Sequence, residues 1–357
     1  MYHPACQEII DKWSNTTLKK IVNVYQLTYK DCSAPGFGDY IRGCFSMNHF
    51  INTVNTYCGA NIKFDMDIIN HPMSNYIVTA VPDSTINYKE VRDFKLVILK
   101  VIQNSHDKNF RFVLNEIITA FNKINTAEFY TFCCKFEIYD EIKEFDKEFM
   151  RSKLQPNTVM SKYIQDTLNK LNLRRKEYSV LHIRCGDKLA FPPKELTSNF
   201  LTTLNNTVDN SIDPTKTYLV LSDHNGIKAY YACQDKAKFV TRQSEICHLG
   251  ADNCQQTEQT RDTLLDFFLL SEAADIIGIT PYGICGFSQE CAKLYNIPFK
   301  YIRISDSPGN FSMAHMTPEQ RIAYDYMNYE NSQDNQDNQD NQDNQDNQDN
   351  QDNQDNQ

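Results

Sequence analysis

The chain has 357 residues, of which 41% are hydrophobic and 23% charged. This is a globular balance, and at roughly 150 residues per domain the length predicts about two domains rather than a peptide or a small disulfide scaffold. The net charge is −10, but eight Asp in a Gln-Asp-Asn repeat over 333–356 supply −8 of it, so the rest of the chain is nearly neutral and has no general basic field that would attract nucleic acid.

The N-terminal part alternates strand-like and helix-like segments. A β-branched and aromatic run predicts a strand over Ile21–Tyr29, and a turn-rich stretch over 31–39 separates it from a predicted helix over Tyr40–Tyr57. Further predicted elements are strands over Asn61–Phe64, Phe94–Gln103 and Phe129–Tyr139 and a helix over Phe110–Lys123. This order favours an α/β domain over residues 1–150.

The C-terminal part gives a more regular series after a charged stretch over 141–157 that marks a helix start or a crossover between domains. Strands are predicted over Tyr178–Ile183, Thr217–Leu221, Lys238–Thr241 and Asp275–Ile279, and helices over Thr158–Leu173, Leu196–Val208, Gly226–Lys236, Thr263–Ala274 and Phe287–Leu294. The alternation predicts a doubly wound, Rossmann-like domain over 151–330, in which ligands bind beyond the carboxyl ends of the strands.

The sequence also allows predictions about the C-terminal tail, membrane spans and the cysteines. The repeat tail over 331–357 has no apolar residue and is predicted to be disordered. No apolar run is long enough for a membrane span, and no secretion signal is recognisable at the N-terminus, so we expect a cytoplasmic protein. The twelve cysteines form no CxxC pair and no zinc spacing, and we expect mostly reduced, buried thiols and no metal site.

Two polar segments directly follow predicted strands. The first runs from His182 to Lys188 and includes Arg184, whose guanidinium fork matches a phosphate, and Gly186, which permits a sharp turn. A buried strand end with one Arg–Asp pair explains it equally well. The second is Ser222-Asp223, where the carboxylate could accept hydrogen bonds from a base or ribose or could simply cap the next helix.

Two glycine-containing segments precede predicted helices. The stretch from Gly283 through Gly286 to Ser288 could bind phosphate at a helix N-terminus, or could be a plain glycine-rich loop. The stretch Gly36-Phe37-Gly38-Asp39 lacks the glycine spacing of a dinucleotide fingerprint, and no Gly-Lys-Ser/Thr occurs for a P-loop. It could still form a nest of backbone amides for a sugar or phosphate.

Together these segments resemble the GDP-fucose-dependent fucosyltransferases of the alpha-1,2, alpha-1,6 and protein O-fucosyltransferase type. His182–Lys188 resembles their first motif, H-x-R-x-x-D-K or H-x-R-R-G-D. Val220–Asp223 resembles the second, and Asp266–Asp275 with Phe287-Ser288-Gln289 resembles the third. Gly36–Asp39 resembles a G-x-G-D/N loop of the N-terminal half. The resemblance covers about residues 30–300, and the motifs keep the family order.

The resemblance implies the GT-B architecture, with two Rossmann-like domains facing across a cleft and the acceptor on the N-terminal side. It implies inverting transfer of fucose from GDP-fucose to a hydroxyl of a glycan or glycoprotein, without a metal or other cofactor. By motif match, Arg184 would hold the β-phosphate and stabilise the departing GDP. The other donor-binding residues would be His182, Asp187, Lys188, Asp223, Asp266, Ser288, Gln289, Gly36 and Gly38.

Two further positions, Cys185 and Asp39, bear on the expected chemistry. Many relatives have a second Arg where this chain has Cys185, which bears on the phosphate assignment. Asp39 is the candidate for the base that accepts the acceptor's proton, and capping of the following helix is an equally good explanation. The absence of an Asp-x-Asp from the C-terminal half fits metal-independent transfer, in which fixed cations and amides stabilise the leaving group.

Other functions remain open from the sequence alone. They are a glycosyltransferase for another nucleotide sugar, a non-catalytic GT-B-like protein that binds nucleotide or glycan, and a Rossmann-type oxidoreductase. The sequence names neither acceptor nor oligomeric state. Its richness in Asn, Ile, Lys and Tyr and its repeat tail suggest a protist or an amoebal giant virus as source, with the protein in the host cytoplasm or the virion.

Overall fold

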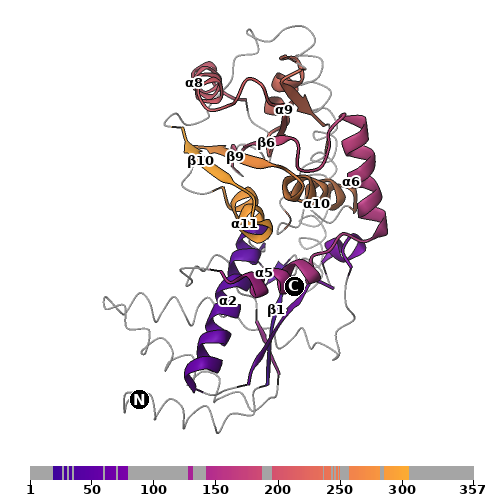
Figure 1. Cartoon of the computed structure of the whole chain (residues 1–357), viewed down its shortest axis with the longest axis vertical. Coiled ribbons are helices and arrows are strands. Elements are labelled where there is room, and N and C mark those ends of the chain that lie inside the picture. The colour runs from indigo at the N-terminus through magenta and orange to yellow at the C-terminus, as the bar shows by residue number, and fades with distance from the viewer. Residues whose placement is uncertain are drawn as a thin grey trace, which may run out of the picture. The chain divides into compact units, whose positions relative to one another are not determined.

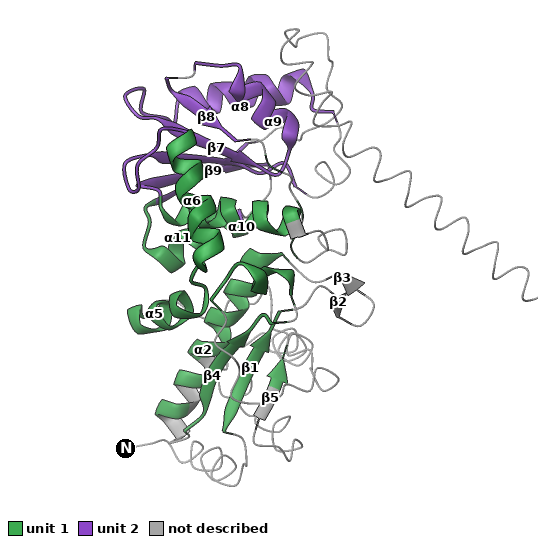
Figure 2. Ribbon diagram, turned by 90° about the vertical axis from the view of Figure 1, so that its right-hand side faces the viewer, with its two compact units in different colours: residues 1–170, 244–272, 286–298 green, residues 171–243, 273–285, 299–357 purple. Residues whose placement is uncertain are grey.

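The computed structural model of the chain describes residues 19–25, 28–29, 32–33, 36–58, 61–69, 71–78, 128–131, 142–186, 195–235, 237–242, 244, 247, 249, 257–281 and 285–304. The chain divides into two compact units (Figure 2). Unit 1 comprises residues 1–170, 244–272 and 286–298, and unit 2 comprises residues 171–243, 273–285 and 299–357. Each unit is therefore assembled from stretches that are far apart in the sequence.

Unit 1 contains a parallel sheet whose middle strand is β1 (Lys20–Val24). It pairs on one side with β4 (Lys63–Asp67) and on the other with β5 (Glu128–Thr131), so that Ile21 lies opposite both Phe64 and Phe129. Ile21, Val22 and Val24 are all buried, as expected for a parallel strand covered on both faces. Figure 1 shows β1 beside the long helix α2 (Phe37–Cys58).

Several boundaries in unit 1 differ from the sequence prediction. The strand predicted over Ile21–Tyr29 is two strands, because β1 ends at Val24 and the short β2 (Thr28–Tyr29) pairs antiparallel with β3 (Cys32–Ser33). The predicted segments over 94–103 and 110–123 lie outside the described residues, as does the predicted strand beyond Thr131.

The helices of unit 1 are α2, α5 (Glu144–Lys153), α6 (Thr158–Lys170), α10 (Thr257–Ser271) and α11 (Gly286–Tyr295), with the short 3-10 turn η1 (Pro72–Asn75). Helix α5 falls within the charged stretch that carried no definite prediction. Its first turn is acidic and its last turn basic, which suits the helix dipole. Its buried Asp146 accepts hydrogen bonds from Asn48 and Asn52 of α2.

Three stacked rings lie in unit 1 and include His71, the residue before η1. Tyr25 is stacked between Tyr40, with ring centroids 4.6 Å apart, and His71, with centroids 4.7 Å apart. Nδ1 of His71 accepts the Met73 N–H, so Nε2 must carry the proton, and it donates to the Leu249 carbonyl at 2.6 Å. Burial lowers the pKa of His71 to about 4, so the imidazole is neutral near pH 7.

Unit 2 is built on a five-stranded parallel sheet of order β10-β9-β6-β7-β8. Its strands are β6 (Ser179–Ile183), β7 (Tyr218–Ser222), β8 (Phe239–Thr241), β9 (Asp275–Thr280) and β10 (Phe299–Arg303), the last of which was not predicted. This is the predicted doubly wound order, with the chain reversing direction across the sheet between β6 and β9.

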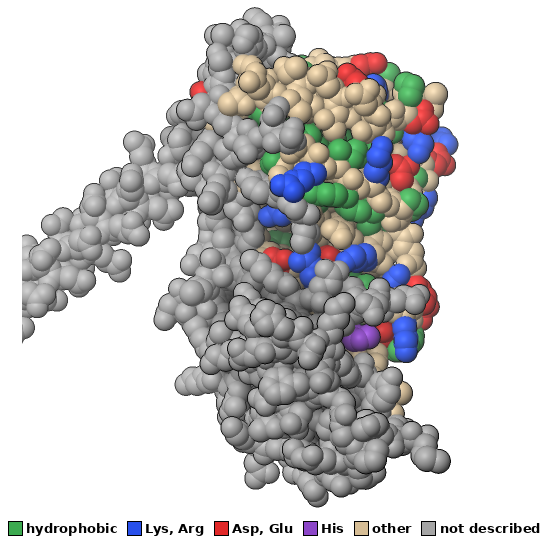
Figure 3. Space-filling view, turned by 90° about the vertical axis from the view of Figure 1, so that its left-hand side faces the viewer, with side chains coloured by type: hydrophobic (Ala, Val, Ile, Leu, Met, Phe, Trp, Pro, Cys, Tyr) green, Lys and Arg blue, Asp and Glu red, His purple; other side chains and the backbone are tan. Residues whose placement is uncertain are grey.

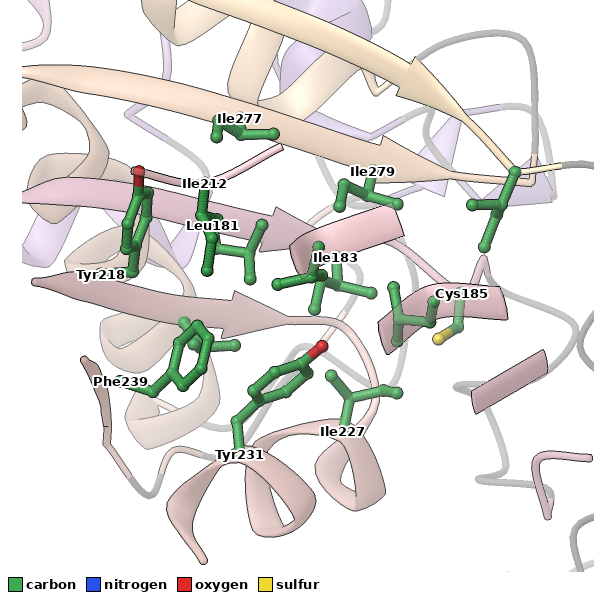
Figure 4. Packing of buried hydrophobic residues seen from close by; sticks show 14 of the residues in the cluster. Leu181, Ile183, Cys185, Ile212, Tyr218, Ile227, Tyr231, Phe239, Ile277 and Ile279 are labelled. Atoms are coloured by element: carbon green, nitrogen blue, oxygen red, sulfur yellow. The ribbon is translucent and has the colours of Figure 1, made fainter. Parts of the chain in front are cut away.

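The helices α8 (Ser198–Asp209) and α9 (Asn225–Ala232) connect β6 to β7 and β7 to β8. Thr197 caps α8 by accepting the Phe200 N–H, and apolar residues at helical spacing, Phe200, Leu204 and Val208, are buried. They join a core cluster with Leu181 and Ile183 of the sheet (Figure 4).

Charged side chains of both signs are interspersed on the described surface. On the face drawn in Figure 3, Lys and Arg side chains lie beside Asp and Glu side chains at several places. Lys153 pairs with Asp65 in unit 1 and Lys216 with Asp275 in unit 2, both at 2.7 Å. Within the part of the chain that the structure describes, no helix has the length and apolar character needed to cross a membrane.

The cysteines follow the sequence expectation only in part. Cys44, Cys185, Cys285 and Cys291 are buried free thiols, as expected for a reduced protein. Cys247 is disulfide-bonded, contrary to that expectation for this residue. Cys233 is a free thiol on the surface.

Candidate functional site

The carboxyl ends of β6, β7 and β9 define the candidate site in unit 2. These strands are neighbours in a parallel sheet, so the residues that follow them meet at one edge. From the adjacent strands β6 and β9, the next strands in the sheet, β7 and β10, lie on opposite sides. In open α/β sheets ligands bind at such a switch point. Arg184 follows β6, Asp223 follows β7 and Cys285 lies beyond β9.

Arg184 is held in place by its backbone. Its N–H donates to the Ile279 carbonyl of β9 at 2.9 Å, which continues the ladder one residue beyond the end of β6. The side chain is half-buried, so the chain direction is fixed while the guanidinium is not sealed in the core. A cation fixed at the carboxyl edge of a parallel sheet suits an anionic ligand.

His182 precedes Arg184 and is almost fully buried within β6. Its Nδ1 lies 3.0 Å from Sγ of Cys285. Burial, with a smaller contribution from the charge of Arg184, lowers the pKa of His182 to about 3. The ring is therefore neutral near pH 7, and it can offer a ligand one N–H donor but no charge.

Asp223 is tied to the turn after β6. Its Oδ1 accepts the Cys185 N–H at 2.6 Å and its Oδ2 accepts the Gly186 N–H at 2.8 Å. Gly186 has a φ of 90°, a conformation that a residue with a side chain rarely adopts. The sequence suggested that Asp223 contacts a base or ribose or caps the next helix. In the structure His224 is the N-cap of α9, and both Asp223 oxygens hold the Cys185–Gly186 backbone.

Cys185 points away from this edge. Its side chain is fully buried in the core cluster of unit 2, in the row that continues from Leu181 and Ile183 (Figure 4). Burial raises the pKa of the Cys185 thiol well above its usual value. An Arg at this position would have to place its charge in an apolar core, so Cys185 suits the packing there.

The Gly36–Asp39 segment of unit 1 is not the loop that the sequence predicted. Helix α2 begins at Phe37 and so includes Gly38 and Asp39. A Cβ on Gly38 would lie 2.6 Å from the carbonyl carbon and oxygen of Gly286, at the start of α11. The missing side chain therefore permits the starts of two helices to touch, which accounts for this glycine without a ligand.

Asp39 belongs to a group of charges between α2 and α11. It accepts a hydrogen bond from Arg42 at 3.2 Å, and Nε of Arg42 donates to the fully buried Glu290 at 3.2 Å. Lys293 also binds Glu290 at 3.2 Å. Burial raises the pKa of Glu290, and the two cations oppose that rise. Arg42 and Glu290 are 248 residues apart in sequence, and no motif identified them.

The other predicted site residues of unit 1 lie on helices α10 and α11. Asp266 is nearly buried in α10, next to Phe267, whose ring contacts Phe37 and Phe287 at centroid distances of 5.0 and 5.6 Å. Ser288 is fully buried in the first turn of α11, and Gln289 is half-buried. The aromatic contacts fix α10, α11 and the start of α2 within one core.

Two predicted site residues lie outside the described residues, and one residue that was not predicted, Cys285, lies at the site. Asp187 and Lys188 lie outside the described residues. Cys285 was not predicted as a site residue, because nothing local to it signals a partner 103 residues away. Within the described ranges, no three His, Cys, Asp or Glu side chains gather closely enough to hold a metal ion.

No protein-family model matches the sequence, and no curated protein matches it. Among solved structures, a variant of Arabidopsis thaliana FUT1 in complex with GDP matches with a TM-score of 0.50 and 10% identity, over 87% of this chain and 83% of that chain. NodZ alpha-1,6-fucosyltransferase soaked with GDP-fucose matches with a TM-score of 0.45 and 10% identity, over 82% of this chain and 97% of that chain. The match to the Arabidopsis protein shows a shared fold.

Proposed function

We propose that this protein is an inverting, metal-independent glycosyltransferase that transfers fucose from GDP-fucose to a hydroxyl of a glycan or glycoprotein. The proposal includes a GT-B architecture with donor binding at the unit 2 sheet. The observation that carries it is Arg184, whose backbone is fixed at the switch point of that sheet, directly before the Cys185–Gly186 turn held by Asp223. The fold shared with a GDP-bound Arabidopsis protein supports it at the level of fold.

The role proposed for the carboxyl edge of the unit 2 sheet is stabilisation of the leaving group. As the bond from fucose to the β-phosphate breaks, negative charge grows on GDP, and a preorganised cation stabilises it more than it stabilises the ground state. Arg184 supplies that cation in the proposal, and neutral His182 supplies a hydrogen bond without adding charge. The backbone hydrogen bond of Arg184 to Ile279 fixes the point from which the guanidinium extends before ligand arrives.

Other roles in the proposal rest on the motif resemblance. Asp266 would recognise the guanine edge, Ser288 and Gln289 would bind phosphate, and Asp187 and Lys188 would support the pyrophosphate. Gly36 would let the backbone approach the sugar, whereas Gly38, which shares this role in the motif, already lies against Gly286. Asp39 is the proposed proton acceptor for the acceptor hydroxyl, and it lies 3.2 Å from Arg42.

The first test is a thermal shift of the full chain with GDP, UDP, ADP and NAD in parallel. A nucleotide at about 100 times its dissociation constant adds about 2.7 kcal/mol to the folded state. We expect a shift with GDP alone and a roughly 10- to 100-fold weaker GDP affinity in Arg184→Ala, since a charge-assisted contact is lost. Arg174→Ala is the matched control, because Arg174 lies in the same unit on the surface, paired only loosely with Glu177 at 3.8 Å.

Turnover is the second test. Release of GDP from GDP-fucose in the presence of an acceptor, slowed about 10²–10³-fold in Arg184→Ala, would support transfer. Binding of UDP or ADP in place of GDP would still support an enzyme that uses a nucleotide sugar, but it would contradict GDP-fucose as the donor. GDP binding without turnover for any acceptor would identify a binding protein, and failure of every nucleotide to bind would remove the assignment of this edge.

A further inference from the structure

Cys285 and His182 meet beside Gly278 of β9. His182 of β6 lies opposite Gly278 of β9 in the sheet register. A Cβ on Gly278 would lie 3.5 Å from Cβ of Cys285 and 2.9 Å from the Phe299 ring. The Phe299 ring takes the space that a side chain at 278 would fill, and Cys285 lies at ordinary contact distance beside it. From this place Sγ reaches Nδ1 of His182 at 3.0 Å.

Both partners are enclosed, so their hydrogen bond is not exchanged for water. Cys285 is a free thiol with no exposed surface, and His182 is 6% exposed. The neutral imidazole has one N–H and one lone-pair nitrogen, and which nitrogen carries the proton is set by its partners. The thiol is a weak donor and a weak acceptor, whereas the imidazole lone pair is the basic site of the pair and the better acceptor. The contact is therefore more favourable with the S–H donating to Nδ1 than with Nδ1–H donating to sulfur.

We infer that Cys285 is a positioning residue whose thiol donates to Nδ1 of His182, fixing the ring as the neutral Nε2–H tautomer. A fixed N–H donor suits an oxygen of a nucleoside diphosphate, which a lone pair in the same place would repel. This consequence for the ligand rests on the proposed function, whereas the tautomer itself does not.

The tautomer can be measured directly by ¹⁵N NMR of the full chain with labelled histidine. His182→Gln identifies the His182 signals among those of the eight histidines. In the wild-type protein near pH 7, we expect Nδ1 to resonate as an unprotonated nitrogen and Nε2 as a protonated one. Observation of the Nδ1–H tautomer in the wild-type protein would overturn the inference, and this result needs no Cys285 variant to fold.

Two substitutions separate the hydrogen bond from packing. Cys285→Ser keeps a donor of similar size and should keep the Nε2–H tautomer. Cys285→Ala removes the donor, and the Nδ1–H form should appear in the spectrum. Cys291→Ala is the matched control, because Cys291 is a buried free thiol that instead contacts the Phe267 carbonyl at 3.5 Å. If Cys285→Ala leaves the tautomer unchanged, the thiol does not set it.

GDP affinity gives the functional readout. We expect Cys285→Ala to weaken GDP binding by roughly 3- to 10-fold, the effect of one hydrogen bond, and Cys285→Ser and Cys291→Ala to change it less than about twofold. Equal loss in Cys285→Ala and Cys291→Ala would assign the effect to packing. If the wild-type protein does not bind GDP at all, the proposed function fails, while the NMR measurement still decides the role of Cys285.

Discussion

Asp223 uses both carboxylate oxygens on the backbone of a turn 37 and 38 residues earlier in the sequence. This contact explains how the chain after β6 keeps a glycine at a positive φ two residues after Arg184. Sequence patterns identified the aspartate as notable, but they could not choose between a ligand, a helix cap and this backbone contact. A carboxylate oxygen that accepts hydrogen bonds could fill all three roles. Only the three-dimensional course of the chain shows which groups reach it.

We predict that Asp223→Ala destabilises the protein by about 2–4 kcal/mol, because two partly buried N–H groups lose their acceptor. Asp223→Asn keeps one acceptor oxygen and should lose less. Urea unfolding measures both. The control is Asp213→Ala, since Asp213 accepts the Thr215 N–H in an exposed turn of the same unit. Equal losses at the two positions would show that the Asp223 contacts are not specially important.

The buried histidines predict a pH dependence of stability. The folded pKa of His71 is about 4, below its ordinary value of 6.5. As the pH falls below 6.5 the unfolded state takes up this proton first, so stability is full above that pH and is lost progressively toward pH 4. For His71 the loss amounts to about 3 kcal/mol. Burial raises the pKa of Glu290 and Asp146, which partly offsets the trend at the acid end.

Urea unfolding at several pH values between 5 and 8 measures this dependence, and below pH 6.5 we expect a slope of about one proton each for His71 and His182. His71→Gln should reduce the slope by about one proton, and the part due to His182 should remain. A wild-type stability that is flat or rises between pH 6.5 and 5 would contradict the lowered pKa values.

At the scale of elements, the clearest departure from prediction is the start of α2. Glycine disfavours a helix interior, so Gly36-Phe37-Gly38-Asp39 reads as a loop from local propensity. In the structure the helix begins at Phe37, and Gly38 lies against Gly286 of α11. Contact between distant helices overrides the local preference, because only a residue without a Cβ permits this approach.

Gly38→Ala tests which effect dominates. Alanine gains up to about 1 kcal/mol in an unstrained helix. Here its Cβ would lie 2.6 Å from backbone atoms of Gly286, which cannot rotate away. We expect a net loss of about 1–3 kcal/mol in the free energy of unfolding. Gly278→Ala should cost less, because its Cβ would meet the end of the Phe299 ring at 2.9 Å and a side chain can move. A stabilised Gly38→Ala would contradict the helix contact.

At the scale of the whole molecule, the chain passes repeatedly between its two compact units. Helices α10 and α11 belong to unit 1, although β9, which lies between them in the sequence, and β10, which follows α11, belong to unit 2. The sequence predicted contiguous domains over 1–150 and 151–330, since composition and periodicity report only on neighbours along the chain.

The repeat tail over 331–357 lies outside the described residues, and its prediction comes from composition alone. It carries eight Asp and no apolar residue, so it has nothing to bury in a core. A chain ending at Ser332 should therefore unfold with a free energy within about 0.5 kcal/mol of the full chain. It should also bind GDP as the full chain does. A clearly lower melting temperature for the shortened chain would show that the tail contributes to the fold.

The sequence by itself determined the alternating α/β character, four strands of the unit 2 sheet and the position of Arg184 after a strand. These follow from hydrophobic periodicity and β-branched runs, which depend on near neighbours. Tertiary structure decided which distant groups meet: the Asp223 contact with the turn, the Cys285–His182 pair and the Gly38–Gly286 approach. Each joins segments widely separated in the chain, and their proximity depends on strand order and helix packing, which local patterns do not encode.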